Sequence, residues 1–364
     1  MLIHTLPDGD LVHHYKKSIV IIFSGKRHVI STGPNNGGYR KNLQAVFNRD
    51  DNPGPGMACI MKDDSYVGHM NLVALDDLGL DPAKCSGLST AASMDNASVK
   101  SLNYRDLTVT AIVTAGIEHN GGRAGDPATY YEENGAFYNL TEKGCEAGND
   151  LLTPGTINII LHINADLDPG TLARTIMTAT EAKAAALQEL MVRSHNSDGL
   201  ATGSGTDGII SISNPFSSLK LTNAGKNSKL GELIGKTVMG AVKEALQKQS
   251  GLCPDKQRDI LRIMGRYGID EDRLWDEYQG NLTKADFIDR LDRLKNSSEI
   301  VNLTLMYVHV LDLLKWGLIK PEEADQMTDR LMPEGVRTGN FLEGQNGLIE
   351  KYVMFLLSQV GSGD

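Results

Sequence analysis

Short apolar runs with a period of two predict β-strands in the first half of the chain. The clearest runs are residues 107–114 and 156–163, and residues 209–213 form a shorter run of the same kind. Within 156–163, isoleucine or leucine at alternate positions fills one face, which leaves Asn158 and His162 on the other. Residues 18–32 are typical of a β-hairpin, because two apolar runs flank a Ser-Gly-Lys turn.

Helical periodicity follows the strand patterns. Residues 168–192 begin with Asp168, an N-cap carboxylate, and Pro169, at the first helical position, and continue through an alanine-rich stretch. Residues 229–249 repeat apolar side chains at helical spacing. Strands that alternate with helices predict an α/β or α+β domain, with a mixed sheet and packed helices, over residues 1–250.

The pattern changes after residue 250. The rest of the chain has almost no strand pattern and carries helical patterns separated by glycine, asparagine and proline turns. The predicted helices are residues 254–267, 284–294, 301–316, 321–331 and 347–360. We therefore expect a second, all-α domain over residues 251–364.

Charge narrows the classes of partner. Among the 364 residues, 36 lysines and arginines stand against 46 aspartates and glutamates, and the formal net charge is -10. A negative protein repels phosphate backbones and anionic lipid surfaces, so we expect no nucleic-acid and no membrane partner. Four scattered cysteines disfavour disulfides and thiolate zinc sites. The N-terminal residues lack the segments of a secretory signal, so we expect a cytoplasmic protein. Formation of homo-oligomers is left open.

The first of three glycine- or threonine-rich segments with candidate chemistry spans residues 114–127. Small residues at the end of a strand let backbone amides approach a ligand closely. The candidates for binding or catalysis in this segment are Thr114, Gly116, Asn120, Arg123 and Asp126. The alternative is a solvated loop in which Asp126 caps a following helix and Arg123 makes a surface salt bridge.

The second segment lies within the predicted helix 168–192. Three threonines within six positions are unusual there, because threonine is a poor helix former. The candidates are Thr178, Thr180, Glu181 and Lys183, and Thr178 and Glu181 share a face of the helix. The alternative is that the hydroxyls bond to helix carbonyls and that Glu181 is solvated.

The third segment, residues 201–210, alternates glycines with hydroxyl side chains before a strand. Such a turn can hold an anion or an oxyanion, with Asp207 as a base or a metal ligand. The candidates are Gly203, Gly205, Thr206 and Asp207. The alternative is a glycine-rich entry to a hairpin. Outside the three segments, His162 is a candidate base or substrate-binding residue, with a structural histidine on a strand as the alternative.

Taken together, the three segments, a Gly-Thr-Ile-Asn-Ile-Ile stretch from Gly155 and a Lys-Leu-Gly-Glu-Leu-Ile stretch from Lys229 resemble the adenosylcobinamide amidohydrolase family, the CbiZ type. The resemblance covers about residues 15–250. It implies hydrolysis of the amide that joins the aminopropanol group of adenosylcobinamide to its corrin ring, with a corrinoid as substrate. It assigns no definite cofactor to that reaction.

Amide hydrolysis needs a base or nucleophile, an oxyanion donor and an acid for the leaving amine. We expect Asp207 or Glu181 as the base, and Lys183 or Asn120 with glycine-loop amides as the oxyanion donors. Arg123 and Asp126 are the expected positioning residues. A covalent route through Thr206 or Thr178 is the less favoured variant. All these roles require the three segments to meet in one site.

The helical tail is similar to small helical phosphatases that include α-ribazole phosphate phosphatase. The resemblance therefore indicates a bifunctional enzyme of the CbiS type, with α-ribazole phosphate as a second substrate. Glu299, Asp312 and Glu334 are candidate ligands for a divalent cation such as magnesium. The alternatives are a tail that only packs or makes an oligomer contact, and a protein that binds or carries corrinoids without cleaving them.

Overall fold

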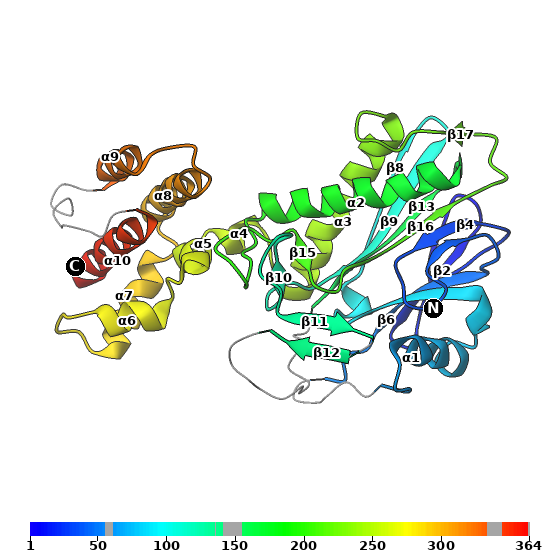
Figure 1. Cartoon of the computed structure of the whole chain (residues 1–364), viewed down its shortest axis with the longest axis horizontal. Coiled ribbons are helices and arrows are strands. Elements are labelled where there is room, and N and C mark those ends of the chain that lie inside the picture. Colours follow the sequence, from blue (N-terminus) through cyan, green and yellow to red (C-terminus); the bar gives the residue numbers. More distant parts are fainter. Residues whose placement is uncertain (55–60, 135, 141–154, 333–343, 363–364) are drawn as a thin grey trace. The chain divides into compact units, whose positions relative to one another are not determined.

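The computed structural model describes residues 1–54, 61–134, 136–140, 155–332 and 344–362 (Figure 1). The chain divides into two compact units, Met1–Cys253 and Pro254–Asp364. The boundary that the sequence predicts near residue 250 lies beside this division.

Two mixed β-sheets form the centre of the first unit. In spatial order, sheet A contains β1 (Leu2–Thr5), β2 (Leu11–Tyr15), β3 (Ser18–Ile22), β6 (Ala45–Asp50) and β7 (Cys85–Thr90). Sheet B contains β5 (Gly38–Arg40), β4 (His28–Ser31), β16 (Gly208–Ser213), β13 (Ile157–Ile163), β9 (Leu107–Ala115) and β8 (Ser98–Tyr104). The strands predicted at residues 107–114, 156–163 and 209–213 are confirmed as β9, β13 and β16, which are neighbours in sheet B.

Three short strand pairs lie outside these sheets. They are β10 (Gly121–Gly122) with β15 (Gly203–Ser204), β11 (Tyr130–Glu133) with β12 (Ala136–Asn139), and β14 (Asp166–Leu167) with β17 (Lys220–Leu221). The β10–β15 pair joins segments that are distant in sequence, and the candidate site depends on it.

The predicted hairpin of residues 18–32 is wrong. β3 pairs with β2 and β6 in sheet A, whereas β4 pairs with β5 and β16 in sheet B. The chain crosses between the sheets near Arg27, whose buried guanidinium binds the Asp10 carboxylate at 2.7 and 2.9 Å. Apolar alternation predicts that a segment is a strand, but it does not choose the sheet that the strand joins.

Helices cover the outer faces of both sheets, which gives four layers. α1 (Tyr66–Leu72) and the π-helix η1 (Val73–Asp77) pack on sheet A, where Phe47 lies against Met70 and Val73. The long helices α2 (Pro169–Glu189) and α3 (Lys229–Ser250) lie beside sheet B (Figure 1). A third apolar core, which includes Val46 and Ile160, lies between the two sheets. The 3-10 helices η2 (Pro82–Lys84) and η3 (Met94–Asn96) complete this unit.

The two faces predicted for β13 are confirmed. Ile157, Ile159, Leu161 and Ile163 belong to the core under α2 and α3, and Ile160 belongs to the core between the sheets. Asn158 therefore points toward sheet A, where its partners lie. The start of α2 is also as predicted, since the Asp168 side chain accepts hydrogen bonds from the amides of Gly170 and Thr171.

Among the described residues of the second unit, the regular elements are all helices. Its helices are α4 (Pro254–Gln257), α5 (Ile260–Met264), η5 (Gly265–Tyr267), α6 (Glu271–Glu277), α7 (Lys284–Leu294), α8 (Ser298–Lys315), α9 (Pro321–Leu331) and α10 (Gln345–Gly361). The predicted helix 254–267 is split into three, because Asp259 caps a new helix at α5. The predicted fold class, mixed sheets with packed helices followed by an all-α region, is confirmed. Among the described helices, none combines the length and apolar composition that a membrane span requires.

Candidate functional site

One end of the two-sheet sandwich collects polar side chains. β6 and β7 run parallel, and so do β13 and β16. The carboxyl end of β6 meets the amino end of β13, because Asn158 donates a hydrogen bond to Asn48 at 2.8 Å. Asn48 in turn donates to Thr114, near the end of β9, at 2.8 Å. We call this end, marked by Asn48, Thr114 and Asn158, the strand-end region.

The three residues that mark this region are buried. Thr114 and Asn158 are each 1% exposed and Asn48 is 3% exposed. Asn158 also donates a hydrogen bond to the carbonyl of Ser89 on β7, at 2.9 Å. These hydrogen bonds link strands of sheets A and B at this end. The candidate substrate-binding residue Thr114 is enclosed in the network as a hydrogen-bond acceptor.

The first and third glycine segments lie together beside this network. Gly121 pairs with Ser204 and Gly122 with Gly203 in the β10–β15 ladder. The Thr202 hydroxyl also accepts a hydrogen bond from the Ala124 amide at 2.9 Å. The sequence placed candidates in both segments, and the ladder brings those candidates to one place.

Asn120 and Gly155 make a second link between these segments and β13. The Asn120 side-chain amide donates to the Gly155 carbonyl. Gly155 has a φ of 149°, and a Cβ there would lie 2.6 Å from Asn120 Oδ1, so only glycine fits. Thr156, the next residue, shares a hydrogen bond of 2.7 Å with the Thr206 hydroxyl. The Gly116 amide donates to the Thr156 carbonyl at 3.1 Å.

Lys183 and Asp207 form a buried ion pair next to this link, with side chains 8% and 10% exposed. Asp207 also accepts hydrogen bonds from the amides of Ile157 and Ser204, at 2.9 and 3.0 Å, and from the Ser204 hydroxyl at 2.6 Å. Two donors therefore serve each carboxylate oxygen. A Cβ at Gly203 would lie 2.6 Å from Lys183 Nζ, which explains the glycine. The ion pair thus holds the turn before β16 against β13.

Asp126 links the first glycine segment to the loop that follows α2. It accepts hydrogen bonds from the hydroxyls of Ser194 and Ser197, at 2.5 and 2.6 Å, and from the Arg123 amide at 2.7 Å. Burial raises the pKa of Asp126, but the two serine hydrogen bonds and Arg123 outweigh this effect and leave the pKa below its ordinary value. The Arg123 side chain is exposed, as are Gly205 and Thr206.

Of the candidates in the second predicted segment, only Lys183 lies beside the glycine segments. Thr178 donates to the Ala224 carbonyl at 2.7 Å, and Glu181 is 53% exposed in an ion pair of 2.5 Å with Lys226. Positions two apart on a helix point about 200° apart, so Glu181 and Lys183 face opposite sides of α2. Glu181 therefore lies apart from Asp207. Thr180 is exposed.

His162 also lies away from the strand-end region. It sits near the far end of β13, fully buried, with Nε2 3.4 Å from Asp8 and 3.5 Å from Asp10. Burial raises the pKa of Asp10, but the contact with His162 and hydrogen bonds from Ser24 and Arg27 lower it more, so the net shift is downward. These contacts give His162 a place in a buried charged cluster that joins the β1–β2 loop to sheet B.

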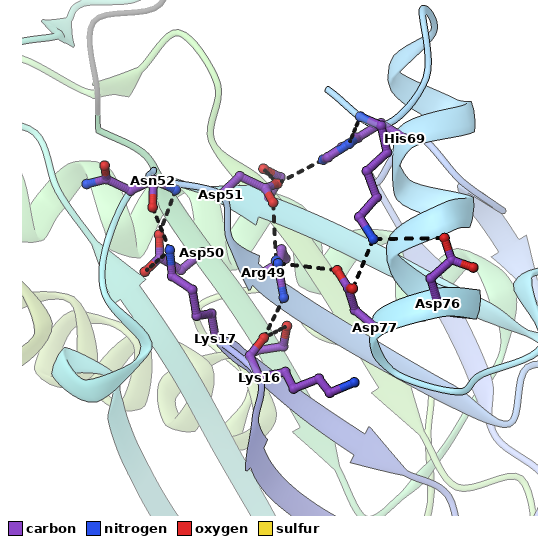
Figure 2. A network of polar contacts seen from close by, with 12 residues as sticks. Lys16, Lys17, Arg49, Asp50, Asp51, Asn52, His69, Asp76 and Asp77 are labelled. Carbon is purple, nitrogen blue, oxygen red and sulfur yellow. Dashed lines mark hydrogen bonds and ion pairs between the residues drawn. The ribbon is translucent and has the colours of Figure 1, made fainter. Parts of the chain in front are cut away.

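A charged network that the sequence analysis missed lies at the carboxyl ends of β6 and β7 (Figure 2). Asp51 Oδ2 accepts a hydrogen bond from Ser89 Oγ at 2.5 Å and lies 3.3 Å from His69 Nε2. Asp51 Oδ1 lies 3.2 Å from Arg49 Nε, and the same guanidinium contacts Asp77 at 3.3 Å. Figure 2 shows Arg49 between the two aspartates. The signal in the sequence was the run of polar residues 48–52 directly after an apolar strand.

Asp50 is a third aspartate of this network. Asp50 accepts a hydrogen bond from the Asn52 amide at 2.8 Å, and Lys17 lies 3.7 Å away (Figure 2). Burial raises the pKa of Asp50, and the Asn52 amide and Lys17 only partly offset this effect. Asp50 and Lys17 thus join the end of β6 to the turn between β2 and β3.

The metal ligands predicted in the second unit do not converge in its described residues. Both carboxylate oxygens of Asp312 bind the Arg266 guanidinium, at 2.7 and 2.6 Å, and the Tyr267 hydroxyl donates to Asp312 at 2.8 Å. Glu299 is exposed in the first turn of α8, and Glu334 lies outside the described residues. Over the part of the chain that is described, no group of three or more His, Cys, Asp or Glu side chains could hold a metal ion.

The chain is similar to a known family and to proteins of Methanocaldococcus jannaschii and Pyrococcus horikoshii. Residues 3–254 match the family described as CbiZ, adenosylcobinamide amidohydrolase. The uncharacterized protein MJ1613 of Methanocaldococcus jannaschii is 37% identical over 248 residues, which span 68% of this chain and 91% of that protein. The crystal structure of the PH0078 protein from Pyrococcus horikoshii OT3 aligns over 74% of this chain and 90% of its own, at 12% identity and a TM-score of 0.34. The last likeness is too distant to support an argument.

Proposed function

Because the chain belongs to the adenosylcobinamide amidohydrolase family, we propose that it hydrolyses the amide between the aminopropanol group and the corrin ring of adenosylcobinamide. The products are aminopropanol and adenosylcobyric acid. The observation that carries the proposal is the extent of the family match. It runs over residues 3–254 and so includes both sheets, their covering helices and the whole strand-end region.

The strand-end region supports this proposal as the place of reaction. Its parts come from rigid strands of both sheets, and rigid elements hold reacting groups more accurately than loops do. Exposed residues of the glycine segments, including Gly205 and Thr206, border it. We propose that these segments bind the corrinoid, because backbone amides and hydroxyls can pair with the amide groups on the edge of a corrin ring.

The contacts refine the roles expected from the sequence. Asp207 already accepts four hydrogen bonds, so we assign it and Lys183 to holding the turn rather than to proton transfer. Glu181 is paired with Lys226 on the opposite side of α2 and has no part in the proposed site. Asn120 and the amides of the glycine segments remain the proposed donors to the oxyanion.

The direct test is incubation of the purified full chain with adenosylcobinamide. Chromatography with mass detection should show aminopropanol and adenosylcobyric acid in equal amounts. A change in the corrinoid absorption spectrum without either product would instead identify a carrier. No product and no spectral change would overturn both functions.

A phosphatase activity of the second unit remains a prediction from the resemblance. The family match ends at residue 254, and Asp312, one of its candidate ligands, is engaged by Arg266 and Tyr267. Incubation of the full chain with α-ribazole phosphate, with and without magnesium, tests this prediction. Magnesium-dependent release of phosphate would establish the activity, and no release under either condition would remove it.

A further inference from the structure

The Ser89–Asp51 contact joins two residues that are distant in the sequence. Several hydroxyl–carboxylate pairs among the described residues are helix caps or local turns, such as Ser65 with Asp63 and Thr171 with Asp168, whereas Ser194 and Ser197 bind Asp126 from a distant loop. Ser89 and Asp51 are 38 positions apart and meet where two parallel strands end. Ligands of α/β proteins commonly bind at the carboxyl ends of parallel strands. This pair therefore occupies a position typical of a reacting site.

The geometry sets the direction of the hydrogen bonds around Asp51. His69 Nδ1 accepts a hydrogen bond from the Lys62 amide at 3.0 Å, so that nitrogen carries no proton in this arrangement. The ring proton then lies on Nε2, which faces Asp51 at 3.3 Å. Asp51 cannot donate when ionised, so Ser89 is the donor in the 2.5 Å contact. The Asp51 carboxylate thus accepts the serine proton in this hydrogen bond, and His69 and Arg49 hold the carboxylate in place.

Two hydrogen bonds hold Ser89 in position, and the residue remains partly accessible to solvent. Its carbonyl accepts a hydrogen bond from Asn158, at 2.9 Å, and its hydroxyl is bound to Asp51. The residue is only partly buried, and the Asp51 side chain is 12% exposed. Ser89 is hydrogen-bonded to Asn158, which directly follows Thr156 and Ile157 in the chain. Thr156 contacts Thr206, and Ile157 contacts Asp207. A serine here lies next to the segments that we propose bind the corrinoid.

We infer that Ser89 is the nucleophile of the amidohydrolase and that Asp51 is its general base, an inference that rests on the proposed function. Ser89 Oγ attacks the amide carbonyl carbon while its proton passes to Asp51. The carbon–nitrogen bond then breaks, and protonated Asp51 returns the proton to the leaving aminopropanol nitrogen. This step leaves the corrinoid acid as an ester on Ser89.

Water completes the cycle. It attacks the ester carbonyl and gives a proton to Asp51, the bond from carbon to Ser89 Oγ breaks, and the proton returns to Oγ. The net change is one water consumed, with one amine and one carboxylic acid released, and no oxidant or metal is needed. His69 and Arg49 act through Asp51 and are positioning residues.

Labelling tests the reactivity of Ser89 without a corrinoid. The full chain is treated with an aryl sulfonyl fluoride, and the modified peptide is identified by mass spectrometry. A serine with a paired base should displace fluoride and carry the label, and the labelling rate should be at least about 100-fold lower in Asp51→Asn. Asp76→Asn is the matched control, because Asp76 belongs to the same charged network but contacts Lys62 at 3.9 Å and not Ser89. A label on other serines with none on Ser89 would overturn the inference.

Turnover provides the second test. Ser89→Ala should lower kcat on adenosylcobinamide by at least about 100-fold, with an unfolding temperature close to that of the wild type. Ser101→Ala is the matched control, because it also removes a strand hydroxyl, one bonded to Thr110 at 2.7 Å, and should keep the wild-type rate. If Ser89→Ala keeps more than about a tenth of kcat, the nucleophile assignment is wrong and the amidohydrolase function stands. Absence of aminopropanol release by the wild type, with Ser89 labelled, would instead refute the proposed substrate.

Discussion

Two strand–helix–strand crossovers meet at the strand-end region, one from each sheet. In sheet A, β6 leads through α1 and η1 to β7, and in sheet B, β13 leads through α2 to β16. In each crossover a carboxylate lies next to a strand end. The covering helix carries a basic side chain that contacts this carboxylate. In sheet A the pair is Asp51 with His69, and in sheet B it is Asp207 with Lys183.

The two pairs differ in what else reaches the carboxylate. Asp207 is occupied by the amide and hydroxyl of Ser204 in its own turn and by the Ile157 amide of β13, so it holds the turn against β13. Asp51 binds the hydroxyl of a partly exposed serine on the neighbouring strand. The same arrangement of a strand-end carboxylate and a basic side chain can thus fix a loop or activate a hydroxyl, and the other partners of the carboxylate decide which.

The largest effect should come from Lys183→Met. The substitution keeps an apolar stem but leaves the buried Asp207 carboxylate without its cation. We expect a loss of about 4 kcal/mol in the free energy of unfolding, measured with urea, because a buried charge without its partner is strongly destabilising. Lys226→Met removes the exposed pair with Glu181 and should change little. Equal stability of both variants would refute the structural role of the Lys183–Asp207 pair.

Asp10→Asn tests a buried charge that lies outside the two crossovers. Its effect should be smaller, about 2 kcal/mol at neutral pH, because the asparagine oxygen can still accept a hydrogen bond from Arg27. The pKa of Asp10 is lowered in the folded state, so its stabilisation is present above the ordinary pKa of 3.8 and is lost as the pH falls through the lower folded value. Acid unfolding between these values should therefore be shallower in Asp10→Asn. A stability profile with the same acid limb in both proteins would contradict this assignment.

His69→Gln tests whether His69 positions Asp51 for catalysis, a role that Lys183 does not have toward Asp207. Glutamine keeps a donor near Asp51 but changes its position, so the base should be less well aligned. We expect kcat on adenosylcobinamide to fall about 10-fold with KM unchanged, while stability falls less than in Lys183→Met. An effect on KM alone would show that His69 contributes to substrate binding and does not position Asp51.

Glu181→Gln should have the smallest effect. Glu181 is exposed and lies on the side of α2 opposite Lys183, so turnover should stay within about twofold of the wild type. Steady-state kinetics with adenosylcobinamide measures it directly. A large fall in kcat would bring Glu181 back as a catalytic candidate and would weaken the assignment to Asp51.

The pattern of apolar residues determined much of this fold. It predicted β9, β13 and β16, the start of α2, most of α3 and several helices of the second unit, because periodicity reports which face of an element is buried. It did not place β3 and β4 in different sheets, since a strand pattern carries no information on its partner. Glycine-rich composition also marked the segments around Asn120 and Asp207, although not their pairing.

Tertiary structure alone decided the chemistry of the site. His69 and Ser89 lie 18 and 38 positions from Asp51, in stretches with no motif that joins them. Conversely, Glu181 and Lys183 are close in sequence yet face opposite sides of α2. Sequence determines which surfaces must be buried, through local periodicity. Which polar groups then meet depends on how the sheets stack and cross, and that arrangement is a property of the whole packed core.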